Sequence, residues 1–508
     1  MRSATAIGLN HQGVSCVDRS SPALRVVALV FGAAAALAIV AHLVVSLWAQ
    51  HEFTQVESIV AMHSNALAEG EGLYYDLNSY PFTVSPYGPV FYSLSALLQK
   101  AGAPLLAAGR VLSFIALLAS LWILWRGLGC MIEDRRVVWA GVLLAACNAN
   151  LLFWAATGQT DMLACCFSLW AFTEFLAWRK ERANWRLVTA GLFVALAIFT
   201  KQTMLAAGAA IAISLFIEDR KRGIQWIAAL AAAGAAVALI LNWATAGHYF
   251  DNAIRANLNP FAAAKLWSQA SYLLLANAGL LLIAVLGIRD GLRRYAPLYL
   301  YTALTGGVWL LTASKIGSDL NYQVEFSLAL TMCAACSLGS LHFFRELLER
   351  RHSWVTLLQL PLLVFIVLNL ALTANSIAGR VALEPVKQTE ANALRPYLDS
   401  NAGRLLTTHL GPLVQTRRRM EVEPLIYTLL VGAGMTDPEP VRGDLSAGRF
   451  ETVILYEDIF APEPAWKNAE VPSLPAAHLE EMRKNYRLVR RIPGPMLDGV
   501  YVYEPLRD

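Results

Sequence analysis

Charged side chains are scarce in this sequence, and their scarcity excludes an ordinary soluble protein. Only 15% of the 508 residues are Asp, Glu, Lys or Arg, whereas 56% are hydrophobic. A soluble globular protein usually carries about 25% charged residues, so much of this chain is expected to face lipid. The formal net charge of +4 is weak, which argues against a nucleic-acid partner.

Cysteine is absent after Cys336, although seven cysteines precede or occupy that position. Disulfide bonds therefore cannot staple the C-terminal region. Two pairs, Cys165–Cys166 and Cys333–Cys336, lie inside apolar runs, where a thiol usually packs as a small apolar group. We interpret both pairs as core residues and not as a metal site.

Apolar runs of the length needed to cross a bilayer, about 20 residues, recur along the first three quarters of the chain. We expect eleven spans, near residues 26–48, 105–125, 137–156, 162–178, 187–200, 203–217, 224–243, 270–288, 296–313, 326–344 and 355–374. The first run extends from Ala23 to Trp48, which is too long for the apolar part of a cleavable signal peptide.

Positive charges in the loops predict the orientation of these spans. Arg2, Arg19 and Arg25 precede the first span, which favours a cytoplasmic start. Up to residue 375, the predicted inner loops contain sixteen Lys and Arg residues and the outer loops five, and cytoplasmic loops carry such an excess. We therefore predict a multi-pass protein of the cytoplasmic (inner) membrane, with a cytoplasmic tail (1–23), a transmembrane domain (24–375) and an extracytoplasmic, periplasmic domain (376–508).

The apolar stretch 86–102 is not expected to cross the membrane. It contains Pro86, Pro89 and Lys100, and if it crossed, every later loop would change sides and present its positive charges outward. We interpret it as an interfacial helix in a long first outer loop, residues 49–104.

Beyond Arg380, short apolar runs alternate with polar, proline-containing segments, which is typical of a small α/β domain. The expected strands are 404–408, 451–456, 486–492 and 499–503, and the expected helices are 424–433 and 476–485. The predicted fold class is an all-α polytopic membrane protein with a small C-terminal α/β soluble domain.

Ionisable residues gather at the outer ends of the predicted spans, whereas transporters usually place them near the midplane. Glu52 and Glu57 follow the first span, and Asp161 begins the fourth. Each has an ordinary alternative role: a solvated loop carboxylate for Glu52 and Glu57, and a helix cap for Asp161. Lys201 lies in a short turn between two spans, where a lysine commonly snorkels to water.

This arrangement suits a reaction between a membrane-anchored phosphate donor and an acceptor from the aqueous side. A carboxylate would accept the proton of the attacking hydroxyl. A lysine or arginine would stabilise the negative charge on the departing phosphate, and the interfacial helix would hold the head group at the correct depth.

The order of several short sequence motifs along the chain is informative. They are a carboxylate-bearing first outer loop, G-x-x-x-Y-x-D from Gly70, P-Y-G-P-V-F-Y from Pro86, D-M at Asp161, T-K-Q-T from Thr200 and G-S-D-L-N-Y-x-x-E from Gly317. This order resembles the GT-C superfamily of glycosyltransferases, which use polyprenyl-phosphate sugars. Its relatives include protein O-mannosyltransferases, lipid A aminoarabinose transferases and lipopolysaccharide galacturonosyl transferases, and the resemblance covers roughly residues 24–375.

The resemblance implies roles for the acidic residues. In that superfamily an acid of the first outer loop acts at the acceptor hydroxyl, and here it is Glu57 or Glu52, with Glu57 preferred. Many relatives open this loop with Asp-Glu, where this chain has His51-Glu52. Asp161 matches the second acidic position, and because some members bind a divalent cation, it is also the expected ligand of a Mg²⁺ or Mn²⁺ ion.

The resemblance also implies a basic residue at the lipid phosphate. Relatives with Lys-Pro-Pro before the surface helix use that lysine, but this chain has Tyr87-Gly88-Pro89 there, so Lys201 or Lys315 is proposed instead. The full set of expected substrate-binding residues is Lys201, Gln202, Lys315, Asn321, Tyr322, Tyr87 and Arg255.

The sequence therefore predicts an inverting glycosyltransferase that moves a sugar from polyprenyl phosphate to a cell-envelope acceptor, which is a lipid, a glycan or a protein. One rival is a lipid-linked glycan flippase or transporter, which would carry internal repeats and polar residues through the midplane. Another is an inactive scaffold that presents the C-terminal domain. Glu57, Asp161 and Lys201 are expected to share one cavity only in the enzyme.

Overall fold

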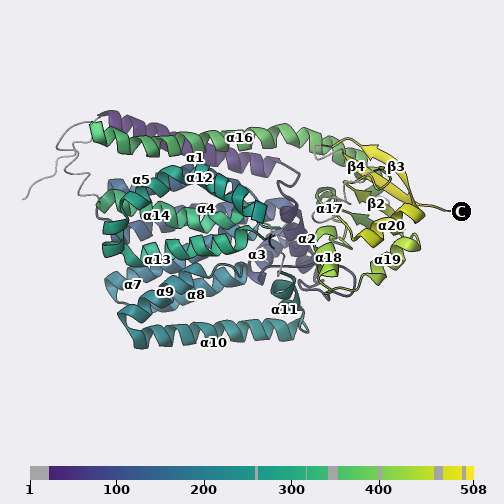
Figure 1. Cartoon of the computed structure of the whole chain (residues 1–508), viewed down its shortest axis with the longest axis horizontal. Helices are drawn as coiled ribbons and strands as arrows, with labels where there is room; N and C mark the ends of the chain where they lie inside the picture. Colours follow the sequence, from purple (N-terminus) through teal and green to yellow (C-terminus); the bar gives the residue numbers. More distant parts are fainter. Residues whose placement is uncertain are drawn as a thin grey trace, which may run out of the picture.

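The computed structural model describes residues 22–257, 261, 263–315, 317–340, 353–398, 403–462, 473–494 and 499–507. Most of the predicted tail 1–23, and the predicted inner-loop residues Arg345, Arg350 and Arg351, lie outside the described residues. A long helical bundle forms one end of the molecule and a small α/β domain forms the other (Figure 1).

A helix, or in one case a pair of helices, lies in each of the eleven ranges in which spans are predicted, as far as the structure describes them. The helices are α1 (Pro22–Trp48), α4 (Leu105–Met131), α5 (Arg135–Cys147) with α6 (Ala149–Ala155), α7 (Thr160–Glu181), α8 (Asn184–Thr200), α9 (Ala206–Glu218), α10 (Arg220–Ala244), α12 (Ala263–Leu286), α13 (Ile288–Ala313), α14 (Val324–Ser340) and α16 (Ser353–Leu398). Six of the described helices are long and apolar enough to cross a membrane alone, or seven if α5 and α6, bent by 60°, form one span. The total of eleven spans stays a prediction.

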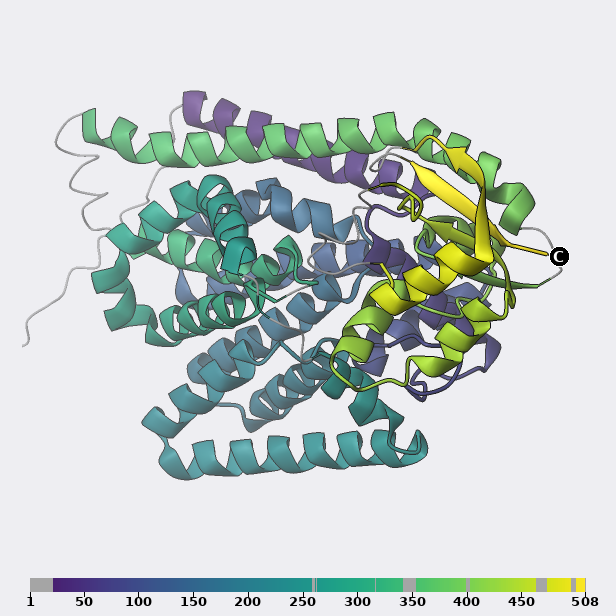
Figure 2. The ribbon, with the colours of Figure 1, turned by 45° about the vertical axis from the view of Figure 1, so that its right-hand side comes forward.

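Helices α7 and α10 show how the bundle separates its core from its lipid-facing surface. Phe172 and Trp178 of α7 are fully buried, whereas Ile240 and Trp243 of α10 are 63% and 84% exposed. Large apolar side chains exposed along a whole helix are typical of a helix that faces lipid. Helices α1 and α16 lie side by side along one edge, and the start of α1 and the C-terminal domain lie at opposite ends (Figures 1 and 2).

The first outer loop forms two helices, α2 (Gln55–Glu69) and α3 (Pro89–Lys100). Thr54 caps α2 by accepting a hydrogen bond from the Glu57 N–H, and Gly70 follows the last residue of α2 with a φ of 85° that suits glycine. Helix α3 has 12 residues and is about 18 Å long. It is thus too short to cross a hydrocarbon core of about 30 Å, in agreement with the sequence prediction.

The C-terminal domain is built on a four-stranded sheet of order β1-β2-β4-β3. Its elements are α17 (Gly411–Thr416), α18 (Pro424–Gly432), α19 (Glu439–Ser446), α20 (Ala476–Asn485), β1 (Arg404–Thr407), β2 (Phe450–Leu455), β3 (Tyr486–Ile492) and β4 (Val500–Pro505). Strands β1 and β2 are parallel and the other pairs antiparallel. The four predicted strands and two predicted helices are confirmed, whereas α17 and α19, with 6 and 8 residues, are too short to show helical periodicity.

Two connections join this domain to the bundle. Helix α16 has 46 residues, or about 69 Å, and continues past the bundle into the domain (Figure 1). Phe82 of the first outer loop forms a parallel bridge with Val422, and its N–H donates to the Glu421 carbonyl at 2.8 Å. Phe82 is 3% exposed and belongs to the core of the C-terminal domain, so the loop and the domain pack as one unit.

Candidate active site

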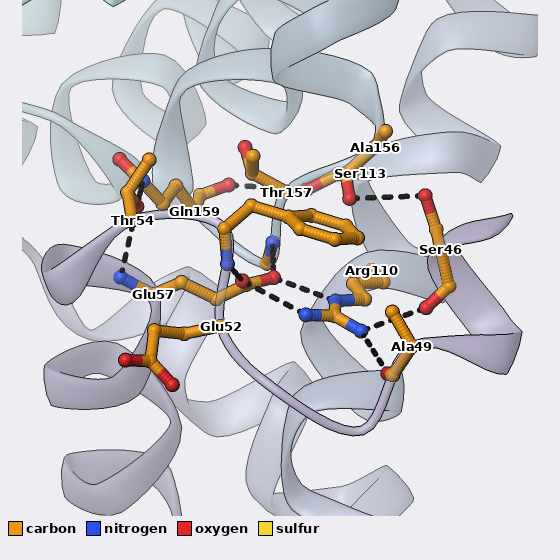
Figure 3. Close-up of polar contacts among 12 residues, drawn as sticks. Ser46, Ala49, Glu52, Thr54, Glu57, Arg110, Ser113, Ala156, Thr157 and Gln159 are labelled. Atoms are coloured by element: carbon orange, nitrogen blue, oxygen red, sulfur yellow. Dashed lines mark hydrogen bonds and ion pairs between the residues drawn. The ribbon is translucent and has the colours of Figure 1, made fainter. Parts of the chain in front are cut away.

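Glu57, the predicted general base, lies in a closed hydrogen-bond network (Figure 3). Its side chain is 0% exposed. Nε and Nη2 of Arg110 donate to the two carboxylate oxygens at 2.8 and 3.0 Å, and the N–H groups of Phe53 and Gly158 donate at 2.8 and 2.7 Å. The carboxylate thus accepts four hydrogen bonds, which is about its full capacity.

The remaining N–H groups of Arg110 also all form hydrogen bonds. They donate to the carbonyls of Ser46, Ala49 and His51 at 2.7, 2.6 and 2.7 Å. Burial would raise the pKa of Glu57, but the Arg110 charge and the hydrogen bonds together lower it below its usual range. A carboxylate with a lowered pKa and no free lone pair is a poor proton acceptor, so this geometry favours a structural role for Glu57.

Glu52 points away from this network (Figure 3) and packs against the C-terminal domain. A Cβ atom added to Gly411 would lie 1.9 Å from Oε2 of Glu52, so the side chain lies directly on the backbone at the start of α17. Burial raises the pKa of Glu52, although the charge of Lys387 opposes the shift. The second predicted carboxylate therefore belongs to the domain interface.

Asp161 and Lys201 form a second buried ion pair. Lys201 Nζ lies 2.5 Å from Asp161 Oδ1, and both side chains are 1% exposed. Lys201 follows the last residue of α8, and Asp161 lies in the first turn of α7, so two helix ends hold the pair. Oδ2 of Asp161 has no hydrogen-bond partner among the residues described, and this carboxylate therefore keeps an unused oxygen.

Two predicted tyrosines surround Lys201. Its Nζ lies 3.9 Å from the ring centroid of Tyr322 and 5.6 Å from that of Tyr87, close enough for cation–π attraction. Asn321, next to Tyr322, is 5% exposed, and its Oδ1 finds no partner in the described part of the chain. Residues from four separate sequence motifs therefore meet around one lysine.

Gly88 allows the first outer loop to pack closely against the turn that carries Lys201. A Cβ atom at Gly88 would lie 2.0 Å from the carbonyl oxygen of Phe199, so the close approach of the first outer loop to the Lys201 turn requires glycine. Nε2 of Gln202 then donates to the carbonyls of Pro86 and Ala253, both at 2.6 Å. The P-Y-G-P motif is thus packed against the turn that carries Lys201 and Gln202.

Arg255 and Lys315 are not brought into this cluster. Arg255 is 63% exposed and pairs with Asp251 at 2.7 Å. Lys315 is half-buried, and its backbone forms an antiparallel bridge with Phe261. Neither contacts the Asp161–Lys201 pair in the interactions of the described residues, so Lys201 is the better candidate for the lipid phosphate.

Sequence reasoning missed two residues of this region, Arg110 and Glu423. An arginine inside an apolar run signals a buried acidic partner, so Arg110 could have been found. Glu423 gives no such signal, because the packing of the C-terminal domain brings it near Tyr87. Burial raises the pKa of Tyr87 and Lys201 opposes this shift, whereas the charges of Tyr322, Asp161 and Glu423 add to it.

An apolar groove of about 540 Å³ opens between α8, α9, α10 and α11 (His248–Ala253). Along α10 its lining extends from Trp226 to Ala238, which corresponds to about 18 Å of helix. Gly88 and Gln202 line it near the first outer loop, and Gln202 is the neighbour of Lys201 in the sequence. The groove is therefore apolar along the bundle and reaches polar groups at its head.

The predicted Mg²⁺ or Mn²⁺ site at Asp161 does not fit its neighbours. The ammonium of Lys201 occupies Oδ1 of Asp161, and a metal ion beside it would be repelled. Within the described ranges, no group of three or more His, Cys, Asp or Glu side chains could hold a metal ion. We therefore assign no step of the reaction to a metal.

A family model described as dolichyl-phosphate-mannose-protein mannosyltransferase matches residues 84–245. No curated protein sequence matches the chain. ArnT from Cupriavidus metallidurans bound to undecaprenyl phosphate has a TM-score of 0.63 at 12% identity, covering 95% of this chain and 98% of that chain. The Archaeoglobus fulgidus oligosaccharyltransferase in complex with Zn and sulfate has a TM-score of 0.50 at 11% identity, covering 92% of this chain and 73% of that chain.

At this level of identity the likeness is one of fold. The predicted fold class, a helical GT-C type membrane protein with a small C-terminal α/β domain, is confirmed. The chain therefore resembles the GT-C glycosyltransferases both in its match to a family model and in its fold, as its sequence motifs predict.

Proposed function

We propose that this chain is an inverting glycosyltransferase that moves a sugar from a polyprenyl-phosphate donor to an extracytoplasmic acceptor. The observation that carries the proposal is the buried Lys201, which follows α8 in the same turn as Gln202, a residue that lines the apolar groove. A polyprenyl chain needs an apolar path and its phosphate needs a cation, and the groove and the lysine supply them. The undecaprenyl phosphate bound by ArnT supports a donor of this chemical class.

In this proposal Lys201 stabilises the leaving group. The acceptor oxygen attacks the anomeric carbon from the face opposite the phosphate, and the bond between that carbon and the phosphate oxygen breaks. The electron pair leaves with polyprenyl phosphate, whose negative charge the ammonium stabilises more strongly in a buried site than in water. Oδ2 of Asp161, which has no partner among the described residues, is free to orient a sugar hydroxyl.

The proposed location is the outer face of the cytoplasmic membrane. The first outer loop and the C-terminal domain lie together at one end of the bundle, and α1 starts at the other end (Figure 1). The excess of positive charge in the predicted inner loops supports a cytoplasmic position for that other end. An acceptor of the cell envelope would therefore reach the site from the side of the C-terminal domain.

The test is donor binding by the full chain in lipid nanodiscs, titrated with polyprenyl phosphate. Lys201→Ala should weaken binding about 10–100-fold, because a hydrogen bond to a charged group contributes roughly 1.5–3 kcal/mol. Lys100→Ala is the matched control, since Lys100 is an exposed lysine at the end of α3. Equal binding by wild type and Lys201→Ala, measured on folded protein, would overturn the proposal.

A further inference from the structure

The C-terminal domain places a buried carboxylate against the first outer loop. Glu423 is 8% exposed, and its N–H donates to the carbonyl of Phe82 at 2.9 Å. Oγ1 of Thr83 donates to Oε2 of Glu423 at 3.2 Å. No basic side chain among the described residues pairs with Glu423. Its carboxylate is buried and accepts hydrogen bonds from Thr83 and from the backbone of Val84.

Thr83 also belongs to a directed chain of hydrogen bonds. Nε2 of His63 lies 3.0 Å from Oγ1 of Thr83, and Nδ1 of His63 contacts Oγ of Ser85. Burial lowers the pKa of His63 to about 3, so its imidazole is neutral. Because Thr83 donates to Glu423, the consistent arrangement has Ser85 donating to His63 and His63 donating to Thr83. The chain therefore ends at the carboxylate.

A cleft open to water borders this chain of hydrogen bonds. His63 and Thr83 line a cavity of about 180 Å³ between α2 and the segment 417–420 of the C-terminal domain. Its walls also include Tyr75, Glu71 and Arg419, and an aromatic ring among charged side chains suits a hydroxyl-bearing ligand. Thr83 thus contacts both the cleft and Glu423. Tyr87, four residues further along the first outer loop, has its ring centroid 5.6 Å from Nζ of Lys201.

We infer that the cleft admits the acceptor and that Glu423, acting through Thr83, receives the proton of the acceptor hydroxyl. The inference rests on the proposed glycosyl transfer. As the acceptor oxygen bonds to the anomeric carbon and the phosphate leaves with the electron pair, the hydroxyl proton passes to Oγ1 of Thr83. The proton of Thr83 passes to Oε2 of Glu423, so the C-terminal domain completes the active site and Glu423 is a positioning residue.

The electrostatics of Glu423 suit this role better than those of Glu57. Burial raises the pKa of Glu423 to about 7, and a proton acceptor works best with a pKa near the operating pH. Titratable groups near Glu423 among the described residues include Tyr87 of the first outer loop and Tyr92 of α3, whose pKa values burial raises and its charge raises further, and the neutral His63 of α2, which is linked to it through Thr83. A carboxylate accepts protons only when ionised, so transfer should decline as the pH falls through about 7.

The experiment measures sugar transfer and donor binding for the full chain in nanodiscs between pH 5.5 and 8.5, a range that brackets the expected value of about 7. Glu423→Gln should lower turnover about 10²–10⁴-fold, abolish the acidic limb and leave donor binding unchanged. Thr83→Val should lower turnover similarly, and Thr83→Ser should restore it because the hydroxyl remains. Glu439→Gln, at a 62% exposed side chain of α19, should behave as wild type.

Four results would overturn the inference, and they differ in what they say about the proposed function. Wild-type turnover by Glu423→Gln together with impaired Lys201→Ala removes the relay and leaves the glycosyltransferase. Full activity of both variants removes both proposals. Loss of donor binding by Glu423→Gln, or failure of Thr83→Ser to restore turnover, assigns Glu423 and Thr83 to structure alone.

Discussion

Two buried ion pairs, Glu57 with Arg110 and Asp161 with Lys201, differ in how completely their polar atoms are used. Both pairs exclude water, with side chains exposed by 1% or less. Glu57 and Arg110 use their hydrogen-bonding capacity on one another and on five backbone groups. Asp161 retains a free oxygen among the described residues, and Lys201 has two aromatic faces beside it.

This difference separates a structural pair from a ligand site. A saturated pair cannot bind substrate without breaking its own hydrogen bonds, each of which costs free energy to lose. A buried ion pair with an unpaired polar atom lacks a hydrogen bond that a bound ligand can supply. The network of Glu57 therefore orders α1, α2, α4 and the turn before α7, while the pair of Asp161 and Lys201 is available for chemistry.

The largest expected effect is on stability, from Arg110→Met. The substitution leaves the Glu57 carboxylate buried without its cation and the carbonyls of Ser46, Ala49 and His51 without their donors. Removing one partner of a buried pair costs about 3–5 kcal/mol, so the midpoint of thermal unfolding in detergent should fall strongly. A midpoint equal to that of wild type would show that the network does not hold the first outer loop.

The double substitution Asp161→Asn with Lys201→Met should affect activity instead. It removes both charges of a pair that makes few other hydrogen bonds, so the unfolding midpoint should fall less than in Arg110→Met. Transfer per folded molecule should fall about 10²–10³-fold, as expected when electrostatic stabilisation of the leaving phosphate is lost. A double variant with wild-type turnover would remove the distinction between the two pairs.

Gly88→Ala should produce an intermediate effect. The added methyl group would collide with the carbonyl oxygen of Phe199, and forcing atoms into a packed contact typically costs about 1–3 kcal/mol. The turn that carries Lys201 should shift, so the donor Michaelis constant should rise. Gly129→Ala in α4, where nothing lies within 4 Å of the added atom, is the control and should be neutral. Equal kinetics for the two variants would contradict the proposed packing.

The smallest expected effect is that of metal removal. Because Lys201 already supplies the positive charge beside Asp161, exhaustive chelation should leave the transfer rate unchanged. Loss of activity on chelation, restored by Mg²⁺ or Mn²⁺, would mean that the pair opens to admit a cation.

Most of the fold can be predicted from the sequence because membrane spans, helices and strands each produce a hydrophobic pattern in contiguous residues. The eleven apolar ranges and the six predicted elements of the C-terminal domain all correspond to observed elements. The extension of α16 beyond residue 374 was not predicted, because its polar residues there do not resemble a span. There Leu394 and Leu398 pack in one apolar cluster with Leu405 and Val500 of the C-terminal domain, contacts that no local pattern records.

The candidate site could be predicted only in part. Asp161, Lys201, Tyr87 and Tyr322 lie in separate motifs, and the structure brings them together. The sequence favours Glu57 over other acids but does not show that its carboxylate is saturated with hydrogen bonds, because its partner Arg110 lies 53 residues away in the sequence. Glu423 is brought to this region by tertiary contacts, among them the pairing of Val422 with Phe82.

The most direct test of the division between the two pairs is steady-state transfer by Glu57→Gln and Lys201→Ala, both normalised to folded protein. If Glu57 is structural, Glu57→Gln should give less folded protein but near-normal turnover and donor Michaelis constant per folded molecule. Lys201→Ala should raise the donor Michaelis constant and lower turnover. A loss of about 10²–10⁴-fold in turnover per folded Glu57→Gln molecule, the size expected for a lost general base, would contradict this account and restore Glu57 as the catalytic carboxylate.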